Sequence, residues 1–307
     1  MATIASPYKF SLMDGNLRLA AILHNEISLL LADRASLRNH ESIVNYGDIA
    51  GSGSETIRVP LLGVDGYDLM ASTNEATAPG SATALTYLAP EITVARYALQ
   101  RGLTDLAQMT NSGGGPSLEL LVNDFVGAFE MTVTSQICAL FGSFSNSVGN
   151  SSVDLSVDDF MAAVFQLEQS NVNSRPVAVL HPVQVSDLQS SIRQEGGALQ
   201  YVPATQDMLE AKGQGFVGSF AGVDIFKSSK VATSTGRQGA MFVRGAIGYA
   251  EGRMAPNPML GSQVQANGPV VIDVDRATGD TTTLIGNAYF GCAELQDSMA
   301  VLIETDA

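Results

Sequence analysis

Residues 116–142 read PSLELLVNDFVGAFEMTVTSQICALFG and carry the strongest pattern in the 307-residue sequence. Pro116 suits a first helical position, Glu119 favours the positive end of the helix dipole, and Gly142 is a typical helix stop. The apolar side chains recur every three or four positions, as on one face of an α-helix. They are Leu118, Leu121, Val122, Phe125, Val126, Phe129, Val133, Ile137 and Leu140. The pattern predicts one long helix of about 39 Å, at 1.5 Å per residue.

The segment before this helix, residues 50–98, has the pattern of an extended β-hairpin. Apolar residues alternate with other residues over 56–62 and again over 84–98, and a turn-rich stretch, 63–80, separates the two runs. The alternating apolar residues are Ile57, Val59, Leu61, Leu85, Tyr87, Ile92 and Val94. A hairpin on its own is only marginally stable in water. These apolar positions therefore have to pack on something.

Further helices are predicted on both sides of these two elements. Residues 15–37 have apolar positions at helical spacing, and 99–112 is expected to be a short linker helix. Ser156 is a candidate N-cap of another helix, because two aspartates follow in its first turn. Pro176–Leu180 (PVAVL) is expected to be a short buried strand, and a helix should start near Pro182.

The C-terminal half of the chain is mainly strand-like. Apolar and β-branched residues gather in short runs that are separated by Gly, Asp and Asn turns. The predicted strands are 216–220, 223–227, 240–249, 270–274, 281–288 and 299–303. Helices in the middle, with strands in the hairpin and the C-terminal half, indicate the α+β class.

The charge balance argues against several kinds of partner. The formal net charge is −15, from 16 basic and 31 acidic residues. Nucleic-acid binders gain affinity by placing Lys and Arg against phosphates, and anionic membranes attract the same residues. The longest apolar stretches near the N-terminus, 19–23 and 27–32, are too short to cross a membrane. We therefore expect no nucleic-acid binding, no membrane association and no secretion signal.

The cysteines and histidines predict neither a disulfide framework nor a metal site. Cys138 and Cys292 are far apart in sequence and are expected to be reduced, buried side chains. The three histidines, His24, His40 and His181, do not lie near either cysteine in the sequence. No metal ligand and no cofactor are therefore assigned.

Two motifs resemble binding loops, but both have a simpler interpretation. Residues 213–218 (GQGFVG) fit the G-x-G-x-x-G pattern of dinucleotide-binding folds, which requires a strand before it and a helix after it. Here a helical or irregular segment precedes the motif, and a strand follows it. Residues 273–280 (DVDRATGD) space their carboxylates like a calcium loop, but Gly279 is one position late and strands flank the loop. A hairpin turn is favoured there.

No arrangement of catalytic side chains stands out. His181 ends a strand and is expected to have a structural role. Asp158 and Asp159 are more typical of a helix N-terminus than of a catalytic pair, because paired carboxylates do acid–base work only when burial separates their pKa values. No G-x-S-x-G elbow is present. The sequence therefore gives no catalytic residue, and the chain is expected not to be an enzyme.

The order of these elements resembles that of the major capsid proteins of tailed bacteriophages, a fold also seen in encapsulin shells. The resemblance lies in the hairpin at 50–98, the helix at 116–141 and PVAVLHPVQVSDLQSSI (176–192). Gly218–Val231 resembles a recurrent pattern of the family, with its apolar, Gly and Ser positions in register. AMFVRGAIGYAEGRMAP (240–256) and the closing residues 290–307 resemble later strands of the family.

The resemblance implies how the chain is divided. It implies an N-terminal arm and helix at 1–49 and an extended hairpin loop at 50–98. It also implies a peripheral domain, which contains a long spine helix, at 99–142 and 251–307, and an axial domain at 143–250. The hairpin would then be covered by a neighbouring subunit. The expected inter-subunit contacts are Ile57, Val59, Leu61, Leu85, Tyr87, Ile92 and Val94.

The resemblance also implies a function. It implies hexamers and pentamers of this chain in an icosahedral shell that encloses DNA without specific binding. Portal, scaffolding and decoration proteins are the implied partners, the virion is the implied location and the host cytoplasm the site of synthesis. The short stretch before the hairpin leaves no room for a cleaved scaffolding segment, so a separate scaffolding protein, or none, is expected. The alternatives are an encapsulin-type cellular compartment and, from a different class, a soluble α+β enzyme near His181 and Asp158/Asp159.

Overall fold

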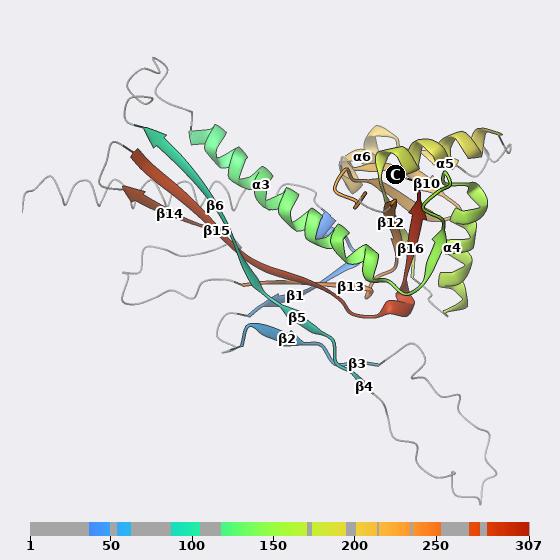
Figure 1. Ribbon diagram of the computed structural model, residues 1–307, viewed down its shortest axis with the longest axis horizontal. Helices are drawn as coiled ribbons and strands as arrows, with labels where there is room; N and C mark the ends of the chain where they lie inside the picture. Colours follow the sequence, from blue (N-terminus) through green and yellow to red (C-terminus); the bar gives the residue numbers. More distant parts are fainter. Residues whose placement is uncertain are drawn as a thin grey trace, which may run out of the picture.

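Mixed helices and strands make up the computed structural model, which has the predicted α+β class. It describes residues 37–49, 54–62, 87–104, 118–170, 174–194, 201–213, 215–233, 236–252, 270–276 and 281–306. The helix predicted over 15–37 lies outside these ranges except for Leu37, which begins the 3₁₀ turn η1 (Leu37–Asn39). Figure 1 shows an elongated molecule with two main sheets, joined by one long helix.

The larger sheet has seven strands, and it combines segments from 147 to 305. Its order is β7 (Ser147–Gly149), β16 (Ala300–Thr305), β12 (Arg237–Phe242), β8 (Val177–Leu180), β11 (Val223–Lys227), β10 (Phe216–Phe220) and β9 (Tyr201–Pro203). The central strand β8 runs parallel to β11 and antiparallel to β12. All four residues of β8 are buried, as the PVAVL run predicted. A strand covered on both faces needs such a continuous apolar run.

Both faces of this sheet are covered within the chain, and the side chains alternate between two cores. Val177 and Val179 point into the core under helix α3 (Leu118–Ala139). Ala178 and Leu180 point into the core under α4 (Val157–Gln169) and α5 (Pro182–Gln194). The predicted start of α4 is confirmed, because the Ser156 side chain accepts a hydrogen bond from the Asp159 N–H at 3.1 Å. The Ser156 hydroxyl in turn donates to the Asp159 carboxylate at 2.6 Å.

The second sheet has five strands: β1 (Ile43–Asp48), β13 (Ile247–Glu251), β15 (Thr281–Glu294), β14 (Val270–Arg276) and β6 (Ala95–Thr104). The linker helix predicted over 99–112 is wrong in its first part, because residues 99–104 belong to strand β6. Ten consecutive residues of β6 pair with β15. Tyr97 and Leu99 pack against the core while their neighbours are exposed. This alternation of packed and exposed side chains is typical of a strand. Hydrogen bonding to β15 stabilises the strand over the helix that the weak helical pattern predicted.

The long helix α3 (Leu118–Ala139), continued by the 3₁₀ turn η3 (Leu140–Ser143), connects the two sheets. Figure 1 shows it along β6 and β15 at one end and near β12 at the other. Phe129 stacks edge-on against Phe290 of β15, and Phe141 packs near Phe242 of β12. The helix predicted over 116–141 is therefore confirmed over its described part.

One stretch, Asn123–Ser143, has the length and the mean hydropathy, 1.3, of a membrane span. Its apolar stripe is buried in the protein core, with Val126 and Ile137 at 0% exposure. A helix that lies in the core of a protein needs this composition as much as a membrane helix does. The apolar character of α3 is thus explained by its packing between the two sheets.

The strands of the hairpin pair as predicted. Several of its apolar side chains, however, are buried by the same chain. Strand β2 (Thr56–Arg58) pairs with β5 (Glu91–Thr93), and β3 (Leu61–Leu62) pairs with β4 (Tyr87–Leu88). Three of the expected inter-subunit residues are buried within this chain, beside Ala250 and Leu295. They are Val59 at 3%, Ile92 at 0% and Val94 at 9% exposure. In the single chain these three side chains are therefore covered by the chain itself.

A close backbone approach holds the base of the hairpin against the five-stranded sheet. A Cβ atom on Gly291 of β15 would collide with the carbonyl oxygen of Thr93 of β5. Only glycine allows two backbones to come this near. Val59, Ile92 and Val94 can reach Ala250 and Leu295 because β5 lies directly on β15.

Strand pairing crosses the expected boundary between the segments 143–250 and 251–307. Strand β16 follows the 3₁₀ turn η6 (Asp297–Met299) and lies between β7 and β12, so residues 300–305 share a sheet with the segment expected to be axial, not with 251–294. The strand predicted over 240–249 is two strands, β12 and β13, which belong to different sheets. Pairing between strands far apart in the sequence decides which sheet β16 joins and where β12 and β13 separate. The local sequence pattern does not predict such pairing.

Candidate functional site

The side chains considered for catalysis occupy structural positions. His181 follows the last residue of β8, and its Nδ1 accepts a hydrogen bond from the Val183 N–H at 3.3 Å. Burial, and then the charge of Arg237, lower the pKa of His181 below its usual value. Asp159 is engaged in the cap of α4. Within the described part of the chain, no hydrogen bond or ion pair joins His181 to Asp158 or Asp159, so the structure does not bring them together as a catalytic unit.

The G-x-G-x-x-G motif has its flanking elements in the reverse order from a dinucleotide site. Helix α6 (Gln206–Lys212) ends at Gly213, and strand β10 starts within the motif at Phe216. Gly213 has φ +95°, which suits a residue that ends a helix. Gly213 therefore ends the helix, whereas Gly218 lies inside β10, where a Cβ atom would collide with the Val202 carbonyl oxygen. The motif is not followed by the helix N-terminus that would hold a phosphate.

The calcium-like run at 273–280 joins two paired strands. Strands β14 and β15 are antiparallel, with Asp275 opposite Thr283 and Arg276 opposite Thr282. The hairpin predicted at this position is confirmed by this register, while Gly279 itself lies outside the described residues. An EF-hand loop would need helices on both sides.

Both cysteines are free thiols, and of the two only Cys138 is buried as predicted. Cys138 is buried in α3 and Cys292 is half-buried in β15, and neither forms a disulfide. Burial raises the pKa of each thiol to about 12. Since the thiolate is the reactive form, neither side chain is a nucleophile at neutral pH.

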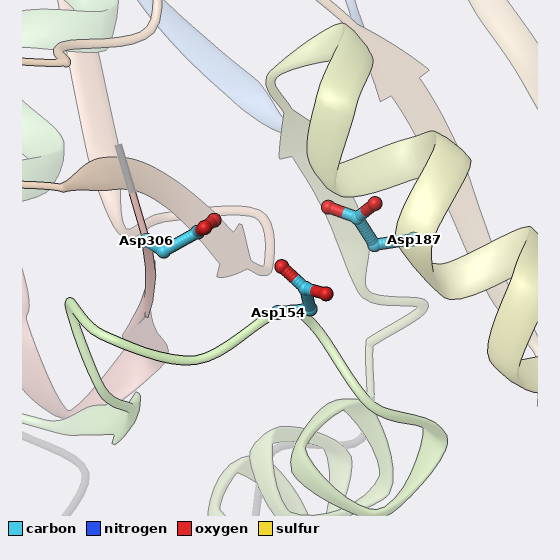
Figure 2. A group of neighbouring side chains, drawn as sticks. All are labelled: Asp154, Asp187 and Asp306. Atoms are coloured by element: carbon cyan, nitrogen blue, oxygen red, sulfur yellow. The ribbon is translucent and has the colours of Figure 1, made fainter.

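Three aspartates that are distant in sequence come together beside the seven-stranded sheet. Asp154, Asp187 and Asp306 point toward one another from the loop before α4, from α5 and from the residue after β16, as Figure 2 shows. Burial, and then the other two carboxylates, raise the pKa of Asp187. Arg237 forms an ion pair with Asp306 at 3.0 Å and supplies positive charge to the group. Sequence reasoning missed this group because no local pattern links positions 154, 187 and 306.

Part of the described hairpin surface is not covered by the chain itself. Of the expected contact residues, Ile57 and Leu61 are half-buried, while Leu85 and the side chain of Tyr87 lie outside what the structure describes. Leu88 of β4 is 45% exposed. The sequence did not single out Leu88, although it lies at the far end of the same alternating strand pair.

Other large apolar side chains are exposed on the domain around the seven-stranded sheet. Met161 and Phe165 lie one turn apart on α4 and are 40% and 59% exposed. They lie off the buried stripe of α4, so the helical pattern did not mark them. The complete set of exposed large apolar residues in the described ranges is Leu88, Met131, Val153, Met161, Phe165, Val183, Val202 and Leu209. A single chain leaves these surfaces uncovered.

A buried ionic network fixes the chain just before the hairpin. Arg38 donates to Glu251 at 2.7 Å and to Glu130 at 3.3 Å, and the Tyr249 hydroxyl donates to Glu251 at 3.1 Å. Burial works against the charged guanidinium of Arg38, but Glu130, Tyr249 and Glu251 outweigh it, so its pKa lies above the usual value. The network joins η1 to α3 and β13, which sets the direction in which the chain enters β1 and the hairpin.

Comparison with known proteins gives the fold its context. No family model and no curated protein matches the sequence. Among solved structures, the capsid of Ralstonia phage GP4 is 12% identical, with a TM-score of 0.61 and 90% of each chain covered. The capsid of cyanophage P-SCSP1u is 13% identical, with a TM-score of 0.59 and 89% of each chain covered. The SrpI encapsulin of Synechococcus elongatus is 10% identical, with a TM-score of 0.59 and 82% of each chain covered.

The chain therefore has the fold that these phage capsids share with the encapsulin. The similarity extends along 82–90% of the chain in these three cases. The family resemblance inferred from the order of elements is confirmed at the level of the fold.

Proposed function

We propose that this chain is a major capsid protein, many copies of which assemble into the icosahedral shell of a tailed bacteriophage. The similarity to phage capsids over 89–90% of both chains is the observation that carries the proposal. Hexamers and pentamers of the chain would form the shell, which would enclose the genome in the virion. The subunit would be made in the host cytoplasm, and it would do no chemistry of its own.

The surface of the single chain supports this proposal. Exposed apolar residues lie at two distant places, at Leu88 on the hairpin and at Met161 and Phe165 on α4. Different patches on one subunit suit head-to-tail contacts, in which one patch of a copy meets another patch of its neighbour, and such contacts close into rings. Each contact can be modest because a shell repeats it many times.

The acidic balance suits the inner wall of a shell that encloses DNA. A net charge of −15 disfavours tight binding to phosphates, so packaged DNA would not adhere to the wall. Portal and scaffolding proteins, and a decoration protein, would be further partners. The DNA would be enclosed without sequence-specific contacts.

The expressed chain provides the test. Size-exclusion chromatography followed by negative-stain electron microscopy should show closed particles or rings of five and six subunits. A stable monomer or dimer at all concentrations, with and without a co-expressed scaffolding protein, would contradict the proposal and favour the soluble α+β enzyme.

An encapsulin-type compartment is the second candidate, and the likeness to SrpI encapsulin supports it. Particles purified from the native source separate the two candidates by their contents. Phage heads would contain long double-stranded DNA, whereas a cellular compartment would contain a cargo protein in fixed proportion to the shell.

A further inference from the structure

Three connections between the two sheets pass through one region, which we call the junction. They are residues 140–146 after α3, residues 243–246 between β12 and β13, and residues 294–300 from β15 to β16. Backbone hydrogen bonds hold them together: the Leu295 N–H donates to the Ala246 carbonyl at 2.8 Å, and the Val243 N–H donates to the Met299 carbonyl at 3.1 Å. In Figure 1 the junction lies where β15 leads into β16.

Two carboxyl groups meet in the junction. Glu294, the last residue of β15, forms a side-chain hydrogen bond with Asp297, the first residue of η6. Oδ1 of Asp297 also accepts a hydrogen bond from the Ser145 N–H at 2.9 Å. Oε2 of Glu294 lies 2.8 Å from the Ser143 hydroxyl oxygen. Because both serines follow α3, the two carboxyl groups connect the end of the long helix with the link between β15 and β16.

These contacts need more protons than the ionised groups supply. The Ser143 oxygen also lies 2.7 Å from the Leu140 carbonyl oxygen. A hydroxyl has one proton to donate, whereas carbonyl and carboxylate oxygens have none. With both carboxyls ionised, one proton has to serve three contacts between oxygen atoms: the two that the Ser143 hydroxyl makes and the one between the carboxyl groups. A proton on Glu294 supplies a second donor and removes the repulsion between two carboxylates.

The surroundings of Glu294 favour this proton. Burial raises the pKa of Glu294, the Ser143 contact lowers it, and the hydrogen bond and charge of Asp297 raise it again, so the pKa lies above the ordinary carboxyl value. No cation in the described part of the chain opposes this rise. Arg244, which belongs to the junction, is exposed and forms no ion pair with the described carboxylates.

The other ionisable groups on the strands beside Glu294 supply no counter-charge either. Cys292 on β15 and Tyr249 on β13 lie opposite each other, and burial raises the pKa of both, so they are neutral at neutral pH. Glu251 on β13 is an anion that is paired with Arg38. Glu294 itself is only half-buried, so protons from the solvent reach it.

We propose that Glu294 is a pH-dependent switch in the junction between the two sheets. With a proton on Glu294, the contacts to Ser143 and Asp297 hold the end of α3 to the link between β15 and β16. Without it, the two carboxylates repel each other and the junction loosens. The inference goes beyond the proposed function, because the switch acts in the folded subunit whether or not the subunit assembles.

Hydrogen exchange of the full-length chain, measured by mass spectrometry, tests the switch. The protection of the backbone amides of residues 294–300, corrected for the intrinsic pH dependence of exchange, should fall at least about threefold between about pH 5 and about pH 8. Helix α5 has no residue in the junction and is the internal reference, so its protection should stay constant.

Two isosteric variants identify the group that titrates. Glu294→Gln carries a donor at every pH and no charge, so it should keep the junction protected at about pH 8 and abolish the pH dependence. Asp297→Asn removes the repelling charge from the other side and should have the same effect. Glu168→Gln, at an exposed position on α4, is the matched control and should keep the wild-type pH dependence.

The contrary outcomes are equally specific. Constant protection of residues 294–300 in the wild-type chain, or a pH dependence that persists in Glu294→Gln, would overturn the switch. Loss of junction protection at every pH in Glu294→Gln would also overturn it, because the carboxylate would then be the stabilising form. Parallel changes in α5 would assign the pH dependence to the whole subunit and not to the junction.

Discussion

The seven-stranded sheet and the hairpin are both built from alternating apolar strands, but they are covered in different ways. Each face of the sheet packs on helices of the same chain, α3 on one side and α4 with α5 on the other. In the described part of the hairpin, its own chain covers the base, where Ile92 lies against Ala250 and Leu295 and Leu61 packs beside them. Beyond the base, at Leu88, apolar surface is exposed.

The difference shows what an alternating pattern can predict. Alternation indicates that one face of a strand is buried, but it does not say which molecule buries it. At Val59, Ile92 and Val94 the same chain does so, against the expectation of a neighbour. Among the described residues, burial by the same chain reaches Leu61 of β3, whereas Leu88 of β4 is exposed.

The largest effect is expected in the sheet. Phe242→Ala removes a fully buried ring that packs near Phe141, and it should lower the free energy of unfolding by about 3–5 kcal/mol. Chemical denaturation of the unassembled subunit measures the loss. A small change would mean that this face of the sheet is not a closed core.

The stability of the subunit should be nearly as sensitive to mutation of the buried ionic network around Arg38, which lies just before the hairpin. Arg38→Ala leaves Glu251 buried and without its guanidinium partner, and it should destabilise the subunit by about 3 kcal/mol. Arg58→Ala breaks the exposed Arg58–Glu91 pair and is the control, with an expected change of at most about 0.5 kcal/mol. Equal effects of the two substitutions in thermal unfolding would contradict a buried anchor.

At the base of the hairpin, Ile92→Ala should lower the stability of the isolated subunit by about 2–3 kcal/mol, because its cover lies in the same chain. This substitution distinguishes most clearly between burial by the same chain and burial by a neighbouring copy. If a neighbour covered Ile92, assembly would weaken while the denaturation midpoint of the free subunit stayed the same.

Leu88→Ser should behave in the opposite way. Leu88 is 45% exposed, so the unfolding free energy of the subunit should change by less than about 0.5 kcal/mol. Assembly should weaken, with a higher subunit concentration needed for particles in light scattering. Unchanged assembly would mean that no neighbouring copy contacts Leu88.

The smallest effect concerns the acidic group beside the sheet. The raised folded pKa of Asp187 means that its ionised form destabilises the fold, and this contribution grows as pH rises through the raised value and vanishes below the ordinary carboxyl range. Asp187→Asn should therefore stabilise the subunit at neutral pH by about 0.5 kcal/mol or less. The gain should fade in acid. Thermal unfolding at several pH values shows the trend, and a loss of stability at neutral pH would refute it.

Much of the fold was predictable where local chemistry decides it. The stripe from Phe125 to Ile137, the Ser156 cap and the buried run of β8 each predicted an element that the structure contains. Helical and strand periods and capping residues act over a few positions, so the sequence reports them directly. The order of these elements was enough to indicate the fold, even though identity to solved capsids is only 9–14%.

The sequence by itself determined the long helix, the capped helix after Ser156, several of the strands and the acidic character of the chain. Only the tertiary structure decided that residues 99–104 are a strand, that β16 joins the seven-stranded sheet, and which chain covers the hairpin base. It also decided that Asp154, Asp187 and Asp306 meet, and that Glu294 meets Ser143 and Asp297 in the junction. These facts depend on pairing between residues far apart in the chain, and no local period or spacing carries that information.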